Sequence, residues 1–169
     1  MPSRLLQLFR FILINAALVA LAACETASPG PAGPSERQQV AARVDELLGR
    51  YAANDQDGVV GMIDQQEFTM YGSDRSEIVH NAGELRQFMT DDFTLWQKAA
   101  IGAVQDLDIR IDRNLATAFF HVPFSAGGRP PVVVRFSTTW KRIGQQWFLT
   151  QSANAVPTTG SSARELIRK

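Results

Sequence analysis

Six polar side chains of this sequence could support acid–base chemistry, namely Tyr71, Asp74, Glu77, His80, His121 and Gln151. Removing a proton beside a carbonyl group needs a carboxylate or imidazole base in an apolar pocket, and a donor for the developing enolate oxygen. Asp74, Glu77 and His80 are the candidates for the base. The sequence alone does not name a reaction that they would serve.

Each candidate also has a purely structural interpretation. An aspartate in a turn, such as Asp74, usually accepts hydrogen bonds from its own backbone. A histidine at a strand end, such as His80, is commonly exposed or hydrogen-bonded, and His121 lies inside a predicted strand, where a satisfied histidine is the default. Tyr71 could simply pack with its hydroxyl at a rim. Both interpretations stay open at this point.

The largest apolar side chains are those of Trp96, Trp140 and Trp147. We expect at least two of them in the core, while one that lined a cavity would offer a stacking surface to a flat or hydrophobic ligand. The predicted ligand pocket contains Tyr71, Trp96, Trp140 and Gln151. Asp91 and Asp92 fall on the polar side of the predicted helix and are interpreted as a solvated face.

The sequence predicts no metal site and no cofactor. His80 and His121 lack metal-ligand spacing, and the single cysteine excludes a Cys-rich zinc site. Residues 55–58 resemble a fragment of a calcium loop, but the first ligand and the bidentate glutamate of that loop are missing. Residues 127–129 lie between predicted strands and open no helix, so they form no phosphate loop.

Composition and charge indicate one ordinary globular domain. The chain has 169 residues, 45% of them hydrophobic and 20% charged, with 17 basic and 17 acidic side chains. Without residues 1–23 it would keep 15 basic and 17 acidic side chains, because only Arg4 and Arg10 lie in that segment. A net charge of −2 gives no reason to expect nucleic-acid binding.

The first 23 residues are predicted to be a secretory signal. Arg4 and Arg10 precede an apolar stretch, residues 11–23, which is interrupted only by Asn15. The stretch is too short to span a bilayer as a helix, and it ends in small residues. A short buried helix is the poorer alternative, because no polar positions alternate with the apolar ones.

Residues 21–24, Leu-Ala-Ala-Cys, resemble the lipobox of bacterial lipoproteins. The resemblance implies cleavage before Cys24 and fatty-acid attachment, such as palmitate, at that residue. It implies a membrane-anchored protein, and Glu25 favours the periplasmic face of the outer membrane. A cysteine placed there by chance is the alternative. Residues 24–34 then form a Pro/Gly tether, 35–157 a folded domain and 158–169 a tail.

The predicted domain begins with helices and continues with strands. Ser35 and Gln38 have the spacing of a capping box, and an apolar stripe follows at Val40, Val44, Leu47, Leu48 and Tyr51. A second stripe comprises Leu85, Phe88, Met89, Phe93 and Trp96. Strands are predicted at 68–71, 77–80, 107–112, 115–124, 132–141 and 147–151. Helices followed by an antiparallel meander predict the α+β class.

This order resembles the SnoaL-like branch of the nuclear-transport-factor-like superfamily. The resemblance rests on the order and spacing of residues 71–74 with Glu77, 84–88, 134–140, Gly144 with Trp147, and 156–157. It implies a strongly curved antiparallel sheet wrapped around two or three N-terminal helices as a cone. It also implies an apolar pocket and homodimers formed through the outer face of the sheet.

The superfamily contains isomerases, cyclases, dehydratases, transport factors and assembly domains, so the fold does not decide the function. Many relatives carry His-x-Ser in the last strand, and counting from Trp147 places Ala153 and Ala155 at those positions. The leading hypothesis is therefore a lipoprotein that binds a small hydrophobic ligand or a protein partner without catalysis. The alternatives are an isomerase, cyclase or dehydratase acting on a hydrophobic carbonyl compound, and a structural dimerisation module.

The state of the cavity would separate these hypotheses. An ionisable side chain inside a closed apolar cavity would favour the enzyme. A cavity filled by large apolar side chains would favour the structural module, and an open cavity without an ionisable group would favour binding alone.

Overall fold

The computed structural model of the chain describes residues 34–96 and 99–157, which belong to the second of two compact units, Pro34–Lys169. The predicted signal, Cys24 and most of the tether lie outside the described residues, as does the predicted tail. The helices are α2 (Glu36–Ala52), α3 (Gln56–Val60) and α4 (Ala82–Trp96). The strands are β1 (Thr69–Tyr71), β2 (Ile78–Val79), β3 (Ala99–Ile101), β4 (Gln105–Asp112), β5 (Leu115–Ala126), β6 (Val132–Ile143) and β7 (Gln146–Ala155).

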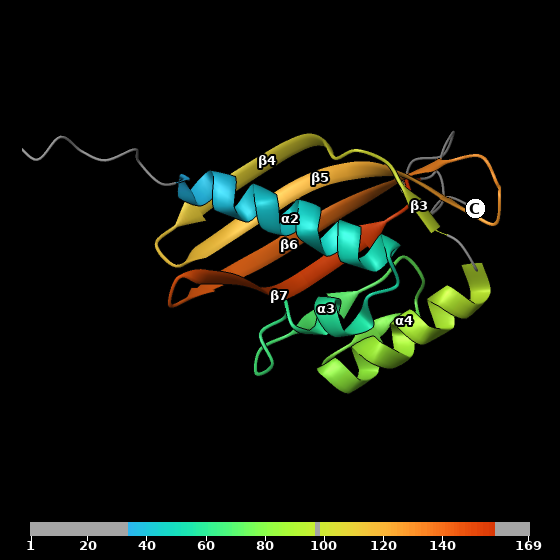
Figure 1. Ribbon diagram of the computed structural model, residues 1–169, viewed down its shortest axis with the longest axis horizontal. Helices are drawn as coiled ribbons and strands as arrows, with labels where there is room; N and C mark the ends of the chain where they lie inside the picture. The colour runs from blue at the N-terminus through green and yellow to red at the C-terminus, as the bar shows by residue number, and fades with distance from the viewer. Residues whose placement is uncertain (1–33, 97–98, 158–169) are drawn as a thin grey trace, which may run out of the picture. The chain divides into compact units, whose positions relative to one another are not determined.

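Seven strands form one curved sheet in the order β2-β1-β7-β6-β5-β3, with β4 also paired to β5 (Figure 1). The long strands β4 to β7 are joined as an antiparallel meander, so the predicted α+β class is confirmed. The short strand β1 departs from a simple meander because it pairs with β7 in parallel. Since Tyr71 lies opposite Ala153, this pairing places the turn between β1 and β2 toward the C-terminal end of β7.

Helix α2 lies across one face of β4 to β7, and that face is the inner face of the sheet (Figure 1). Its apolar stripe explains this position, because Val40, Val44 and Leu48 are all buried in the core. The capping box predicted from Ser35 and Gln38 is confirmed, with both reciprocal hydrogen bonds present. Helices α3 and α4 lie beyond the β7 side of the sheet.

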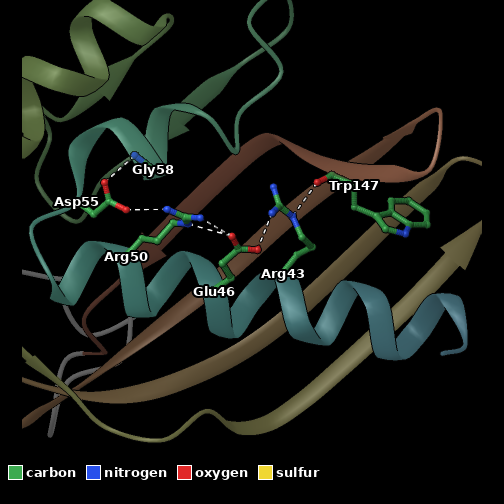
Figure 2. Close-up of polar contacts among 6 residues, drawn as sticks. All are labelled: Arg43, Glu46, Arg50, Asp55, Gly58 and Trp147. Carbon is green, nitrogen blue, oxygen red and sulfur yellow. Dashed lines mark hydrogen bonds and ion pairs between the residues drawn. The ribbon is translucent and has the colours of Figure 1, made fainter. Parts of the chain in front are cut away.

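A chain of ion pairs fixes the second half of α2 to its neighbours (Figure 2). Arg43 donates to the carbonyl oxygen of Trp147 in β7 at 3.0 Å and pairs with Glu46. Glu46 also pairs with Arg50, which in turn pairs with Asp55. Asp55 accepts from the backbone N–H of residue 58 and so caps α3. The fragment that resembled a calcium loop is therefore a helix cap.

Strand β7 contains a β-bulge that reverses which residues face inward. Thr139 pairs with Gln151 and Trp140 pairs with Leu149, so Thr150 is the extra residue. Before the bulge the inward side chains are odd-numbered, as Leu149 is, and after it they are even-numbered, beginning with Ser152. Counting alternate residues from Trp147 predicted that Ala153 and Ala155 face inward, and this prediction was wrong. The bulge shifts the period of two by one residue, so the inward positions beyond residue 150 are the even-numbered ones.

Candidate ligand cavity

A cavity of about 210 Å³ lies between the inner face of the sheet and the helices α2 and α4. Most of its lining side chains are apolar, among them Phe88, Met89, Val122 and Phe136. The polar lining residues are Tyr51, Ser73, Glu77, Asp92, Ser152 and Asn154. An apolar hollow with a few convergent polar groups is the usual form of a small-molecule site.

Tyr51 and Asp92 form the central polar pair of this cavity. The Tyr51 hydroxyl, near the end of α2, donates to Asp92 Oδ2 in α4 at 2.6 Å. The Asp92 side chain is nearly removed from water, since the residue is only 6% exposed. Burial raises the pKa of Asp92 to about 6, against the lowering effect of the Tyr51 hydrogen bond, and the charges of Glu77 and Asp91 raise it further.

Tyr51 is held as a hydrogen-bond donor. Burial raises the pKa of its phenol well above the ordinary value, and the hydrogen bond to Asp92 together with the charges of Asp92 and Glu77 adds to this effect. The phenol therefore keeps its proton across the physiological range. Its position follows from the ion-pair chain of α2, because Arg50 is the adjacent residue (Figure 2).

The interpretation of Asp91 and Asp92 as one solvated face was wrong for Asp92. Asp91 is exposed, but Asp92 lies three residues after Met89 and four before Trp96, so helical geometry places it in the apolar stripe. A single carboxylate within such a stripe was a signal that the sequence contained. The exposed neighbour Asp91 does not share this position, because adjacent residues in a helix point in different directions.

Strand β7 contributes Ser152 and Asn154 to the cavity. Both face inward because of the bulge at Thr150, whereas Ala153 and Ala155 are exposed. The Asn154 Oδ1 atom is buried and has no hydrogen-bond partner among the described residues. A buried acceptor without a partner costs about 1–3 kcal/mol, so this oxygen is available to a donor on a ligand.

The three candidate bases occupy different environments. Glu77 lines the cavity, and its Oε2 atom accepts from the Asp74 backbone N–H at 2.9 Å. Asp74 is an exposed turn residue, and the pKa of its carboxyl is lowered by hydrogen bonds from the backbone N–H and the hydroxyl of Ser76. His80 is exposed and does not line the cavity. Only Glu77 of the three therefore reaches the cavity.

The four residues of the predicted pocket are not brought together. Trp96 lines the cavity, whereas Tyr71 is 53% exposed and lies outside its lining. Trp140 is fully buried in the core, where its indole N–H donates to the Thr138 hydroxyl at 3.0 Å. Gln151 is exposed on the opposite face of β7 and contacts Thr139, because the bulge turns it outward.

The remaining candidates from the sequence do not contribute to the cavity within the described residues. Within residues 34–96 and 99–157, no three His, Cys, Asp or Glu side chains are grouped so that they could hold a metal ion. His121 points away from the cavity and contacts Gln105 at 3.0 Å. The described helices include none that is both long and apolar enough to cross a bilayer.

The outer face of the sheet carries exposed apolar side chains. Phe119 in β5 is 47% exposed and Val133 in β6 is 44% exposed. Pairing of Phe119 with Ser137 and of Val133 with Pro123 places them on the face opposite to the cavity. The homodimer expected through this face stays a prediction.

Comparison with solved structures shows the fold. An NTF2-like protein of unknown function from Pseudomonas putida KT2440 matches with a TM-score of 0.66 and 11% identity, over 79% of this chain and 94% of that one. A protein with a cystatin-like fold from Caulobacter vibrioides matches with a TM-score of 0.66 and 8% identity, over 80% and 100%. A proposed dehydratase of the NTF2-like family from Streptomyces avermitilis matches with a TM-score of 0.63 and 11% identity, over 72% and 95%.

The domain therefore has the NTF2-like fold that the sequence predicted. No protein-family model matches the sequence, and no curated protein is significantly similar to it. Similarity at these identities establishes the architecture alone, so the function has to be argued from the cavity.

The substitution Asp92→Asn tests whether the cavity carboxyl is desolvated. The folded-state pKa of Asp92 is about 6, above the ordinary 3.8, so the folded state holds the Asp92 proton more tightly than the unfolded state does. The stability that this proton adds to the unmodified chain is complete below about pH 4 and is lost as pH rises through 6. The free energy of unfolding of Asp92→Asn, relative to the unmodified chain, should therefore rise by about 2–3 kcal/mol between about pH 4 and about pH 7. Urea denaturation at both pH values measures it.

The matched control is Asp91→Asn, which removes the same charge from the exposed neighbouring position. Its relative stability should change much less over this pH interval. An Asp92→Asn difference that did not depend on pH would contradict the assignment of a raised pKa to Asp92.

Proposed function

We propose that this domain binds a small, largely apolar ligand in the cavity, with a polar group of the ligand directed at Tyr51 and Asp92. The observation that carries the proposal is an apolar cavity that keeps a buried, hydrogen-bonded carboxyl group. Core packing alone would place an apolar side chain at position 92, since burial of a carboxyl destabilises a fold. A functional role explains why the carboxyl is there.

The cavity volume limits the ligand. At about 210 Å³ the cavity is smaller than most ligand pockets, which are about 300 Å³ or larger. The ligand should therefore be smaller than a typical drug-sized molecule, with a flat or flexible apolar body. Phe88, Trp96 and Phe136 supply aromatic contact surface for such a body.

A cavity-filling substitution tests ligand binding. Val122 is buried and lines the cavity, so Val122→Phe should occupy part of the space and weaken binding of 4-phenylbutanol at least about tenfold, as judged by isothermal titration calorimetry. The control is Val133→Phe, the same change on the outer face of the neighbouring strand, which should leave the affinity unchanged. Equal affinities of the two variants, or no binding to the unmodified chain, would contradict the proposal.

Acid–base catalysis is a second candidate function, and the ionisable side chains of Asp92 and Glu77 inside an apolar cavity favour it, as does the pKa of Asp92 near 6. In this mechanism Tyr51 holds Oδ2, and Oδ1 takes a proton from the carbon beside a carbonyl group, which leaves an enolate. The proton on Asp92 exchanges with solvent, and return of a solvent-derived proton from Asp92 to the enolate carbon completes the exchange. The base of the enzyme alternative is thus Asp92, with Glu77 beside it, and not the turn residue Asp74.

Hydrogen–deuterium exchange separates catalysis from binding. The full chain should accelerate exchange of the α-protons of 4-phenyl-2-butanone in deuterated water, with a rate that rises as pH increases through about 6, because the ionised carboxylate is the base. Asp92→Asn should lower the rate at least about 100-fold, and Asp91→Asn should retain it. NMR spectroscopy follows the exchange. Binding without exchange would exclude this candidate for carbonyl substrates.

We also propose lipid anchoring at Cys24, on the basis of the lipobox resemblance at residues 21–24. One acyl chain anchors a protein marginally and two or three anchor it stably, so the processed chain should fractionate with membranes. Radiolabelled palmitate should be incorporated into the unmodified chain in a bacterial host and not into Cys24→Ser. A chain that remained unlabelled and fractionated with cytosolic markers would contradict this proposal.

A further inference from the structure

The polar lining of the cavity is rich in oxygen atoms and holds no basic side chain among the described residues. Glu77 and Asp92 contribute carboxyl groups, Asn154 a carbonyl oxygen, and Ser73 and Ser152 hydroxyl groups. Lys, Arg and His are absent from the described lining. The lining therefore favours positive charge over negative charge in whatever occupies the cavity.

Among the described residues, the cavity carboxyl of Asp92 has one donor and the buried acceptor Asn154 Oδ1 has none. Tyr51 donates to Asp92 Oδ2, and it is the one described residue that donates to this carboxyl group. Asn154 Oδ1 is buried without a partner. The Tyr51 proton is already committed to Asp92, and the other donors of the described lining are the uncharged hydroxyls of Ser73 and Ser152 and the amide of Asn154. The described lining therefore offers two carboxyl groups and no cationic donor to pair with them.

We infer that the cavity selects a ligand in which a protonated amine is attached to a small apolar body, because this group supplies donors and positive charge where the lining supplies acceptors and carboxylates. The inference rests on the proposed ligand binding and names the chemical class of the ligand. An ammonium group has three donors and no acceptor, which matches the lining. A hydroxyl group offers one donor, and a carboxylate offers none and would be repelled.

Electrostatic coupling adds a second argument. The titratable groups that act on Asp92 are Tyr51 from α2, Glu77 from the segment before β2, and Asp91 from its own helix. Glu77 and Asp91 both disfavour ionisation of Asp92, so without a cation the cavity carboxyl is protonated more readily than an exposed one. A bound ammonium would favour the ionised form, and its binding should release protons near pH 6.

A matched ligand series tests the inference on the full chain. The probes are 4-phenylbutylamine, 4-phenylbutanol and 4-phenylbutyrate, which share one apolar body and differ in the terminal group. Near neutral pH the amine should bind at least about tenfold more tightly than the alcohol, and the butyrate more weakly than both. Calorimetry near pH 6 in two buffers of different ionisation enthalpy should show proton release with the amine and none with the alcohol.

Two variants assign the selectivity to the cavity carboxyl. Asp92→Asn should weaken binding of the amine far more than binding of the alcohol, so that the preference for the amine falls to within about threefold, and it should abolish proton release. Asp91→Asn, with the exposed neighbouring charge removed, should keep the preference. Circular dichroism establishes that both variants are folded, and the alcohol titration reports whether the cavity is intact in each.

The outcomes distinguish this inference from the proposed function. Equal binding of amine and alcohol, or tighter binding of the butyrate, would overturn the amine selectivity and leave ligand binding in place. Binding of none of the three probes would overturn both. A preference for the amine that persisted in Asp92→Asn would also overturn the inference, since the inference assigns this preference to the negative charge of Asp92.

Discussion

Burial of the apolar stripe of α2 against the inner face of the sheet is the interaction on which the domain depends. Val40 and Val44 are completely buried at this contact, together with Ile109 from β4 and Leu149 from β7. The hydrophobic effect alone would allow α2 to slide along the sheet, because it is not directional. The hydrogen bond from Arg43 to the Trp147 carbonyl and the ion pairs toward Asp55 fix the helix in one position.

The fixed position of α2 decides where its last turn ends, and Tyr51 lies in that turn. Here α2 approaches α4 closely enough for the Tyr51 hydroxyl to reach Asp92. The contact is polar in a region that is otherwise apolar, and it closes one side of a cavity instead of filling it. A structural module would gain stability from an apolar residue at position 92, so the carboxyl indicates selection for something other than stability.

The three functional hypotheses can now be compared on physical grounds. A purely structural module is disfavoured by an unfilled cavity that contains a desolvated carboxyl and a carbonyl oxygen without a partner in the described part of the chain. Ligand binding needs only the shape and the acceptors of the lining. Catalysis requires in addition that a substrate carbon approaches Asp92 Oδ1, and a pKa near 6 suits a base that works close to neutral pH.

The sequence by itself determined the two long helices, the four long strands and the α+β class, but not the short strand β3 or the parallel pairing of β1 with β7. The capping box at Ser35, the stripes of α2 and α4, and the alternation in β4 and β6 follow from local chemistry and periodicity, which do not depend on distant contacts. Glu77 and Trp96 were also named among the candidates, and both line the cavity. The environments of individual polar side chains were less accessible, because they depend on which elements pack together.

The tertiary structure alone decided the phase of β7 and the role of Asp92. The bulge at Thr150 arises from the pairing of β7 with β6. It turns Gln151 away from the cavity and turns Ser152 and Asn154 toward it. Asp92 became the central polar group because α2 brings Tyr51 to it across 41 positions of sequence. A hydrogen bond between residues so far apart has no signature in local sequence, since its geometry exists only after both helices have packed.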